Sequence, residues 1–585
     1  MPQRTHTCGE LDMEHVGQTV VLSGWVHNVR NLGGLLFIRL RDRYGITQVT
    51  FDQSRDAGLF ARAEALRGEF VVRVQGEVEA RTPENINPDM KTGRIEVMVG
   101  EFQLLNEADL PPFEIMEEVR ASEELRMKYR YLDLRRRRMT RNLELRHRTC
   151  MEIRRFLDDR HFVEIETPFL TRSTPEGARD YLVPSRIHPG KFYALPQSPQ
   201  LFKQLLMVAG MDRYFQIVRC FRDEDLRADR QPEFTQVDIE MSFIEPADIF
   251  ELLEPMMQQV FGLIGIEVAV PFPRLTYREA MDRYGIDRPD LRFGAEIRDI
   301  SAHFRKSEFT LFRRIVAEDG TVRGIAVPDG VSYSRKVLDE LQEVVKANGA
   351  AGLAWIKSED GQVRSSLPKV VGDDQLAQIL QQAGVAAGDA LLIVAGDTPT
   401  VRAALGALRL HVAQRQGWTD PNRFAFCWVV DFPMFEWDVE EQRYFACHHP
   451  FTAPRDPDFT DPATALSHGY DLVLNGLEIA GGSIRIHQET LQKKIFKTLG
   501  ITDDEAREKF GFFLDALRFG TPPHGGIAIG LDRLVMLLAG EKSLREVIPF
   551  PKTTSAMCLL TGSPAEVPAA QLAELKLRSQ ARDHE

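Results

Sequence analysis

Alternation of apolar and polar positions marks roughly the first hundred residues. Because successive side chains of a strand point to opposite faces, this alternation predicts half-buried strands. A helical pattern at about residues 54–67 separates the third strand from the fourth. Five strands with a helix after the third is the order of an OB-fold barrel, which we expect over residues 1–105. The expected strands are Val20–Arg30, Leu35–Arg41, Thr47–Asp52, Phe70–Ala80 and Ile95–Gly100.

Phe37, in the second of these strands, has two interpretations. Aromatic side chains are usually buried, which favours a place in the barrel core. OB-folds also bind single-stranded nucleic acid through exposed aromatic and basic side chains. Arg30 and Arg39 lie near Phe37, and Gln48 lies at the start of the third strand. Both interpretations stay open on these residues alone.

Residues 106–138 read as a connector. Pro111-Pro112 breaks any helix there, and the segment that follows, Ser122–Arg138, is strongly basic. It is either a solvated helix face or a hinge that follows nucleic-acid phosphates. Its basic residues are Arg126, Lys128, Arg130, Arg135, Arg136, Arg137 and Arg138.

Two strands joined by a long charged loop are predicted around residues 214–243. Arg222 follows the end of the first strand, where the sheet would hold its guanidinium. In the second strand Gln236, Asp238 and Glu240 alternate with apolar residues, so they share one face. A sheet face with one fixed arginine and several acids can hold a phosphate beside an amino group. An isolated charged loop would more often be a solvated turn.

The pattern changes over residues 287–418, where helical segments alternate with short strands. We expect an inserted α+β domain there, and no catalytic constellation is visible in it. The expected elements are helices at Lys336–Asn348, Gln375–Ala383 and Thr398–Gln414, and strands at Gly352–Ile356 and Ala390–Val394.

Asp471 and Glu478 flank an Asn475-Gly476 turn, so a hairpin would bring their carboxylates together. Oxygen ligands of this kind suit Mg²⁺ bound to phosphates, although two surface acids would look the same in sequence. The adjacent His448 and His449 would point to opposite faces of a strand. No third ligand lies at metal spacing, so zinc is not expected.

Ser198 and Pro199 have the residue types of a helix start, and Gln200 and Lys203 then lie one turn apart on the same face. A lysine in the first turn opposes the helix dipole, which favours an anionic ligand beside it.

Bulk composition is that of a soluble globular protein, with 43% hydrophobic and 27% charged residues. No apolar run is long enough to span a membrane, and Met1–His15 lacks the apolar core of a signal peptide. The six scattered cysteines never form CxxC, which favours a reducing cytoplasm. The net charge of −13 counts mildly against nucleic-acid binding, although local basic patches can still bind phosphates.

Residues 219–243, containing FRDEDLRADRQPEFTQ, resemble motif 2 of the class II aminoacyl-tRNA synthetases. The sequence of this stretch closely resembles that of the bacterial aspartyl-tRNA synthetases (subclass b). The helix at 140–160 followed by Phe162–Pro168 resembles motif 1, and HGGIAIGLDRLVMLL from His524 resembles motif 3. The resemblance spans essentially the whole chain. It implies an aspartate–tRNA ligase: ATP converts aspartate to aspartyl-adenylate, and the aspartyl group passes to the 3′ end of tRNA-Asp.

The resemblance also implies roles for individual residues. Arg222 and Arg533 would be catalytic, Asp471 and Glu478 would hold Mg²⁺, and motif 1 would form a homodimer interface. Lys203 and Arg485 would hold the side-chain carboxylate of aspartate, and asparagine would leave these two buried cations without an anion. The implied aspartate site is Glu176 (in a lid), Ser198, Gln200, Lys203, Arg222, Asp238, His448 and Arg485. The implied ATP site is Arg222, Asp223, Glu224, Gln231, Phe234, Glu478, Gly530, Leu531, Asp532 and Arg533. The implied anticodon contacts are Arg30, Phe37, Gln48 and Glu96.

The expected multidomain α/β and β organisation has six parts. They are an OB-fold (1–105), a hinge (106–138), the first part of a catalytic domain on an antiparallel sheet flanked by helices (139–286), an inserted α+β domain (287–418), the second part of the catalytic domain (419–555) and a C-terminal extension (556–585). Alternatives remain: an asparagine or lysine enzyme, a relaxed enzyme that also charges tRNA-Asn, or an inactive paralogue. Leu32 stands where several relaxed relatives carry His, which favours the strict form.

Overall fold

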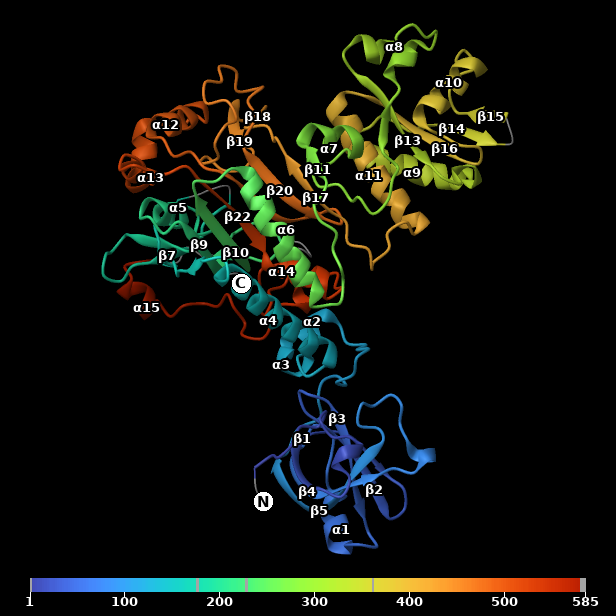
Figure 1. Ribbon diagram of the computed structural model, residues 1–585, viewed down its shortest axis with the longest axis vertical. Coiled ribbons are helices and arrows are strands. Elements are labelled where there is room, and N and C mark those ends of the chain that lie inside the picture. Colours follow the sequence, from blue (N-terminus) through green and yellow to red (C-terminus); the bar gives the residue numbers. More distant parts are fainter. Residues whose placement is uncertain (1–2, 175–177, 227–229, 360–361, 579–585) are drawn as a thin grey trace. The chain divides into compact units, whose positions relative to one another are not determined.

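The computed structural model describes residues 3–174, 178–226, 230–359 and 362–578 (Figure 1). The chain forms two compact units, one of residues 1–144 with 545–565 and one of residues 145–544 with 566–585. Among the described residues, no helix is long and apolar enough to cross a membrane. The six-part division of the chain stays a prediction.

The first unit contains a closed five-stranded barrel in the order β1-β2-β3-β5-β4, which confirms the expected OB-fold. Helix α1 (Ala57–Ala63) lies between the third and fourth strands, as predicted. Val20, Leu22, Ile38, Val49 and Phe51 fill the core. The strands are β1 (Thr19–Asn31), β2 (Leu35–Arg41), β3 (Ile46–Asp52), β4 (Val71–Ala80) and β5 (Ile95–Asn106).

Phe37 does not belong to this core, so the core interpretation is wrong. It lies half-buried on β2, between the buried Leu36 and Ile38, which point into the barrel. The alternation of the strand therefore places Phe37 on the outer face.

Neither interpretation of the basic segment Ser122–Arg138 holds for its buried arginines. It forms α2 (Glu123–Lys128), α3 (Arg130–Asp133) and the start of α4 (Arg137–Asp158). Arg130 and Arg136 are only 2% and 4% exposed, and both donate to the carboxylate of Asp133 at 2.6 Å. Arg130 also donates to the carbonyl oxygens of Pro549 and Ile548. These arginines hold the unit together, because paired buried cations are unavailable to phosphates.

An eight-stranded sheet forms the centre of the second unit. Its six middle strands are antiparallel, and a parallel pair lies at each edge. Its order is β11 (Arg274–Thr276), β17 (Phe426–Val430), β20 (Gly469–Leu474), β21 (Leu477–Ile484), β22 (His524–Gly530), β10 (Glu233–Ser242), β9 (Arg213–Phe221) and β6 (Val163–Glu164).

Helices α5 (Gln200–Val208), α6 (Pro246–Gly262) and α14 (Leu531–Leu538) pack on this sheet (Figure 1). Trp428 is fully buried between strand and helix, where its Nε1 donates to Glu254 Oε1 at 3.0 Å. The other elements around the sheet are α7 (Tyr277–Tyr284), α12 (Glu489–Thr498), α13 (Asp503–Leu517), α15 (Ala569–Glu574), β7 (Leu182–Pro184), β8 (Phe192–Ala194), β18 (Phe435–Asp438) and β19 (Arg443–Ala446).

The insertion has its own antiparallel sheet in the order β12-β13-β16-β14-β15. The three helices and two strands expected there are present, while β12, β13, β15 and α8 were not foreseen. The elements are β12 (Ile297–Asp299), α8 (Thr310–Ala317), β13 (Thr321–Val327), α9 (Arg335–Ala347), β14 (Ala354–Glu359), β15 (Gln362–Ser365), α10 (Asp373–Ala383), β16 (Ala390–Gly396) and α11 (Thr398–Gln416).

Candidate active site

Two adjoining cavities lie on the large sheet, of about 510 and 240 Å³. Arg222, Glu224, Gln236, Glu478 and Ala528 line both cavities, so the two form one continuous site. The sheet explains this convergence, because neighbouring strands β21, β22 and β10 carry residues far apart in sequence to the same face.

A buried ionic network lies in the larger cavity. Lys203 Nζ is 2.9 Å from Asp238 Oδ1 and 3.3 Å from Glu240 Oε2. Arg485 forks onto Glu240, with Nε 2.9 Å from Oε1 and Nη2 3.1 Å from Oε2. Burial raises the pKa of Asp238, although Lys203 opposes the shift. Burial also acts against the charge of Glu240, but Arg485 and Lys203 outweigh it and hold the pKa of Glu240 below its usual value.

This network corrects the expected basis of discrimination against asparagine. Lys203 and Arg485 already have anionic partners in the protein, so a neutral ligand would not leave two unpaired cations. Within the network the charges balance, with two cations (Lys203 and Arg485) against two acids (Asp238 and Glu240), which is 2 − 2 = 0.

Sequence reasoning placed Glu240 on the correct face but gave it no role. The signal was its position two residues after Asp238, which puts both carboxylates on one side of β10. The resemblance places the pair His448 and His449 at the border of this pocket but gave His449 no role of its own: its Nε2 accepts from Arg485 Nη1 at 2.7 Å. Burial lowers the pKa of His449 well below its usual value.

The expectation that His448 and His449 point to opposite faces is wrong. Both line the larger cavity, because β19 ends at Ala446 and the two histidines lie beyond it. His448 Nε2 is 3.5 Å from Asp471 Oδ1. Burial acts against protonation of His448, but Asp471 raises its pKa.

The predicted hairpin brings Asp471 and Glu478 together. Asn475 and Gly476 form its turn with φ of 52° and 83°, values that favour Asn and Gly. A side chain at Gly481 would have its Cβ 2.9 Å from Asp471 Oδ1 and 3.3 Å from Glu478 Oε1. The glycine therefore leaves room for two facing carboxylates. Asp471 and burial raise the pKa of Glu478 to about 7.

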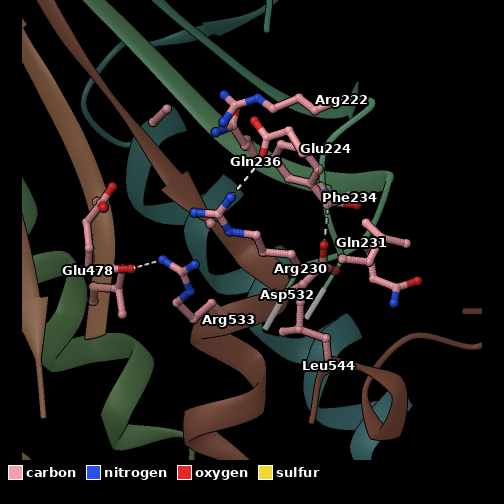
Figure 2. Close-up of a pocket in the computed structure, with 16 residues that line it drawn as sticks. Arg222, Glu224, Arg230, Gln231, Phe234, Gln236, Glu478, Asp532, Arg533 and Leu544 are labelled. Carbon is pink, nitrogen blue, oxygen red and sulfur yellow. Dashed lines mark hydrogen bonds and ion pairs between the residues drawn. The ribbon is translucent and has the colours of Figure 1, made fainter. Parts of the chain in front are cut away.

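The smaller cavity combines an aromatic ring with arginines (Figure 2). The guanidinium of Arg222 lies 5.2 Å from the centre of the Phe234 ring. Arg533, in the first turn of α14, donates to the backbone oxygen of Glu478. Arg230 Nη1 donates to Glu224 Oε2 at 3.0 Å, and its guanidinium reaches across the space between Arg222 and Arg533 in Figure 2.

Two of the expected ATP residues lie outside the smaller cavity, and a third lines it but is bound within the protein. Leu531 is fully buried and does not line the cavity. Asp223 lies outside it, with its carboxylate 3.8 Å from Arg179. Asp532 lines the cavity but is bound within the protein, by the Thr235 amide at 2.7 Å and by Arg146. The other expected ATP residues line the smaller cavity: Arg222, Glu224, Gln231, Phe234, Glu478, Gly530 and Arg533.

The described residues of the expected aspartate site all line the larger cavity: Ser198, Gln200, Lys203, Arg222, Asp238, His448 and Arg485. Glu176 lies outside the described residues, as does most of the loop tip at 226–230. Helix α5 begins at Gln200 rather than at Pro199, although Ser198 Oγ still accepts from the Gln200 amide at 3.2 Å. Gln197 was missed: it lines the cavity and donates to the backbone oxygen of Ala178 at 2.8 Å.

In the first unit the four expected anticodon residues gather on the outer face of the barrel. Arg30 pairs with Phe37 across β1 and β2, and Arg39 pairs with Gln48 across β2 and β3. Gln48 Nε2 donates to Glu96 Oε2 at 3.0 Å. The face thus presents an aromatic ring among hydrogen-bonding groups.

Two family models match the chain. The model described as tRNA synthetases class II (D, K and N) matches residues 122–554, and the model of an OB-fold nucleic acid binding domain matches residues 20–105. A protein of Desulfatibacillum aliphaticivorans named aspartate–tRNA(Asp/Asn) ligase is 53% identical over 98% of both chains. One of Geobacillus kaustophilus named aspartate–tRNA ligase is 54% identical, also over 98% of both.

Solved structures share the fold. An asparaginyl-tRNA synthetase of Pyrococcus horikoshii, complexed with asparaginyl-adenylate, superposes with a TM-score of 0.58 at 18% identity, covering 94% of this chain and 99% of the other. An aspartyl-tRNA synthetase of Entamoeba histolytica gives 0.58 at 20% identity, covering 94% and 91%. The chain belongs to the class II tRNA synthetases of the aspartate, lysine and asparagine group.

Proposed function

We propose that the chain is an aspartate–tRNA ligase that forms aspartyl-adenylate from L-aspartate and ATP and then charges tRNA-Asp. The observation that carries this is the charge pattern of the larger cavity. Lys203 and Arg485 lie beside Asp238, whose Oδ2 is buried without a hydrogen-bond partner among the described residues. A ligand with an ammonium group and a second carboxylate satisfies both sets of groups.

The first step needs orientation rather than a general base, because the α-carboxylate of aspartate is already a nucleophile. One of its oxygens attacks the α-phosphorus of ATP, and the bond to the leaving pyrophosphate breaks. Arg222 lines both cavities and would neutralise charge where carboxylate and phosphate meet. In the second step the 3′-terminal ribose hydroxyl of the tRNA attacks the aspartyl carbonyl, and AMP leaves.

At the amino-acid end, Asp238, with Ser198 and Gln200, would receive the ammonium group. Lys203 and Arg485 would hold the side-chain carboxylate, with Glu240 and His449 fixing Arg485. Both cations are N–H donors, so they suit the carboxylate of aspartate, which only accepts, better than the amide of asparagine, whose nitrogen is itself a donor. A buried donor left without an acceptor costs about 1–3 kcal/mol, and more where the donor is charged.

At the nucleotide end, Phe234 and Arg533 would hold the adenine between them, near Glu224 and Gln231 (Figure 2). Gly530 also lines this cavity. Aromatic and guanidinium groups bind a flat ring well because both offer extended planar faces.

Asp471 and Glu478 fit Mg²⁺. Two facing carboxylates that raise a pKa to about 7 repel each other, and a divalent cation relieves that repulsion. The described residues include no cluster of three or more His, Cys, Asp or Glu side chains arranged for a metal, so phosphate oxygens and water would complete the coordination. When bound, the ion neutralises charge on the phosphates of ATP.

The outer face of the barrel would bind the anticodon, with Phe37 stacking on a base and Arg30, Gln48 and Glu96 reaching base edges.

Motif 1 would form a homodimer interface, because Val163, Phe169, Leu170, Leu182 and Phe192 on neighbouring elements are 43–57% exposed. The free thiols of all six cysteines fit a cytoplasmic enzyme.

Amino-acid-dependent exchange of labelled pyrophosphate into ATP tests the first step. We expect exchange with aspartate and at most traces with asparagine or lysine. Equal exchange with asparagine, or none with any amino acid, contradicts the proposal.

A relaxed enzyme is the second candidate, favoured by the name aspartate–tRNA(Asp/Asn) ligase carried by a close relative. Leu32, 69% exposed between β1 and β2, is the residue that favours strict recognition. Charging purified tRNA-Asp and tRNA-Asn side by side distinguishes the two.

A further inference from the structure

A chain of hydrogen bonds runs from the larger cavity into the protein behind it. Gln200 lines the cavity, and its Nε2 donates to Gln204 Oε1 at 3.1 Å. Gln204 Nε2 lies 3.1 Å from Nε2 of His524, and Nδ1 of His524 lies 2.8 Å from the backbone oxygen of Pro522. Gln204 and His524 are both fully buried, and Gln200 is 5% exposed.

The backbone oxygen of Pro522 fixes the direction of this chain. A carbonyl oxygen can only accept, so Nδ1 of His524 carries a proton. Burial lowers the pKa of His524, so its ring is neutral at physiological pH and its Nε2 is an acceptor. The amide nitrogen of Gln204 must therefore face the ring, which turns its oxygen toward Gln200.

The same logic fixes the amide of Gln200. Its nitrogen donates to Gln204, so its oxygen is the group left for the cavity. The oxygen and nitrogen of a glutamine amide have nearly the same shape, so packing alone does not choose between them. The choice matters here, because an ammonium ligand needs an acceptor and is repelled by an N–H donor.

We propose that Gln204 and His524 are positioning residues that hold the amide oxygen of Gln200 toward the α-ammonium group of the bound amino acid. This rests on the proposed function for the identity of that ligand. Gln200 would share the ammonium with Asp238, which lines the same cavity and whose buried Oδ2 has no hydrogen-bond partner among the described residues. Gln204 and His524 themselves do not line the cavity, so they act through Gln200.

Gln204→Met tests the chain, because methionine keeps the volume and removes the acceptor that orders Gln200. We expect the KM for aspartate in pyrophosphate exchange to rise about tenfold, with kcat and the KM for ATP within about twofold. Gln258→Met is the control: Gln258 also donates a side-chain hydrogen bond, partly buried, to the backbone oxygen of Val268 at 2.8 Å, but it lies on α6 and does not line the cavity. Its KM for aspartate should not change.

A double-mutant cycle separates positioning from general stability. If Gln204 acts through Gln200, then Gln204→Met added to Gln200→Met should leave the KM for aspartate unchanged from the Gln200→Met value. Independent, multiplying effects would overturn the proposal. So would an equal rise in the KM for ATP, or an unchanged KM for aspartate in folded Gln204→Met.

Nitrogen-15 NMR of the histidine-labelled wild-type enzyme gives a test that needs no variant to be active. We expect His524, assigned by its absence in His524→Gln, to be the neutral tautomer protonated on Nδ1. The tautomer protonated on Nε2 would overturn the direction of the chain. Lack of aspartate-dependent exchange in wild type would instead refute the proposed function, so the two failures are distinguishable.

Discussion

Lys203 Nζ lies 2.9 Å from Asp238 Oδ1, and both side chains are 1% exposed. One residue comes from α5 and the other from β10, so the contact exists only in the folded sheet. Because Lys203 is paired before any ligand is present, aspartate enters an ionic network that is already assembled. Preassembly of this kind orients the substrate without rearranging charges.

Replacement of Lys203 should separate amino-acid binding from nucleotide binding. Lys203→Leu leaves Asp238 and Glu240 with one cation instead of two, so the cavity no longer favours an anionic side chain. We expect kcat/KM for aspartate in pyrophosphate exchange to fall about a thousandfold or more, with the Kd for ATP within a few fold. Near-normal exchange in Lys203→Leu would refute the assignment. Lys336→Leu, at an exposed position on α9, is the control.

Glu240 should matter more for stability than any surface acid. Glu240→Gln removes the anion that Arg485 and Lys203 share, leaving buried positive charge. Loss of one partner from a buried pair costs about 3–5 kcal/mol in free energy of unfolding. Glu340 pairs with Arg415 at 3.0 Å, and both of these side chains are exposed. Glu340→Gln should therefore lower the free energy of unfolding by at most about 1 kcal/mol. Thermal unfolding compares them, and equal shifts in Tm would contradict the network.

Local pattern was enough to predict the barrel. Strand β2 has the predicted limits, Leu35–Arg41, because a half-buried strand shows alternating apolar and polar residues in its sequence. The Asp471–Glu478 hairpin was equally readable, since Asn475-Gly476 has the residue types of its turn. The insertion was harder: β12 and β15 have three and four residues, too few to show a period.

The pairing of charges could not be read from the sequence. The resemblance brought Lys203 and Arg485 to one site, but not the fact that Glu240 compensates both. Burial of Arg130, in the basic segment Ser122–Arg138, was not predicted for the same reason. Its partners include backbone oxygens of Ile548 and Pro549, which are distant in sequence. Burial of a charge depends on groups distant in sequence, and a linear pattern contains no information on their distance.

The Asp471–Glu478 pair should destabilise the folded protein at high pH, although the proposed function needs both carboxylates. The usual pKa of Glu478, 4.5, rises to about 7 in the folded state. Its contribution to stability is therefore full below pH 4.5 and is lost as the pH rises through about 7, where the carboxylate ionises beside Asp471. Glu478→Gln should gain about 1–2 kcal/mol at pH 8 and nothing at pH 5, allowing for partial exposure.

Melting temperatures at the two pH values check this, with Mg²⁺ as a second variable. Added Mg²⁺ should raise Tm of the wild type at pH 8 and leave Glu478→Gln unchanged, because the variant lacks one of the two carboxylates. Pyrophosphate exchange should be lost in the variant. An equal gain in Tm at pH 5 and pH 8 would show that the repulsion is not the cause.

Two phenylalanines of the barrel should respond in opposite ways. Phe51 is fully buried, and Phe51→Ala should lower the free energy of unfolding by about 3–5 kcal/mol. Phe37 is half-buried on the outer face, so Phe37→Ala should barely change Tm. It should weaken tRNA-Asp binding by about 1–3 kcal/mol through the loss of base stacking. Pyrophosphate exchange, which needs no tRNA, should stay at the wild-type rate. If Phe37→Ala instead lowers Tm as much as Phe51→Ala, the outer face is a packing surface and the anticodon must bind elsewhere.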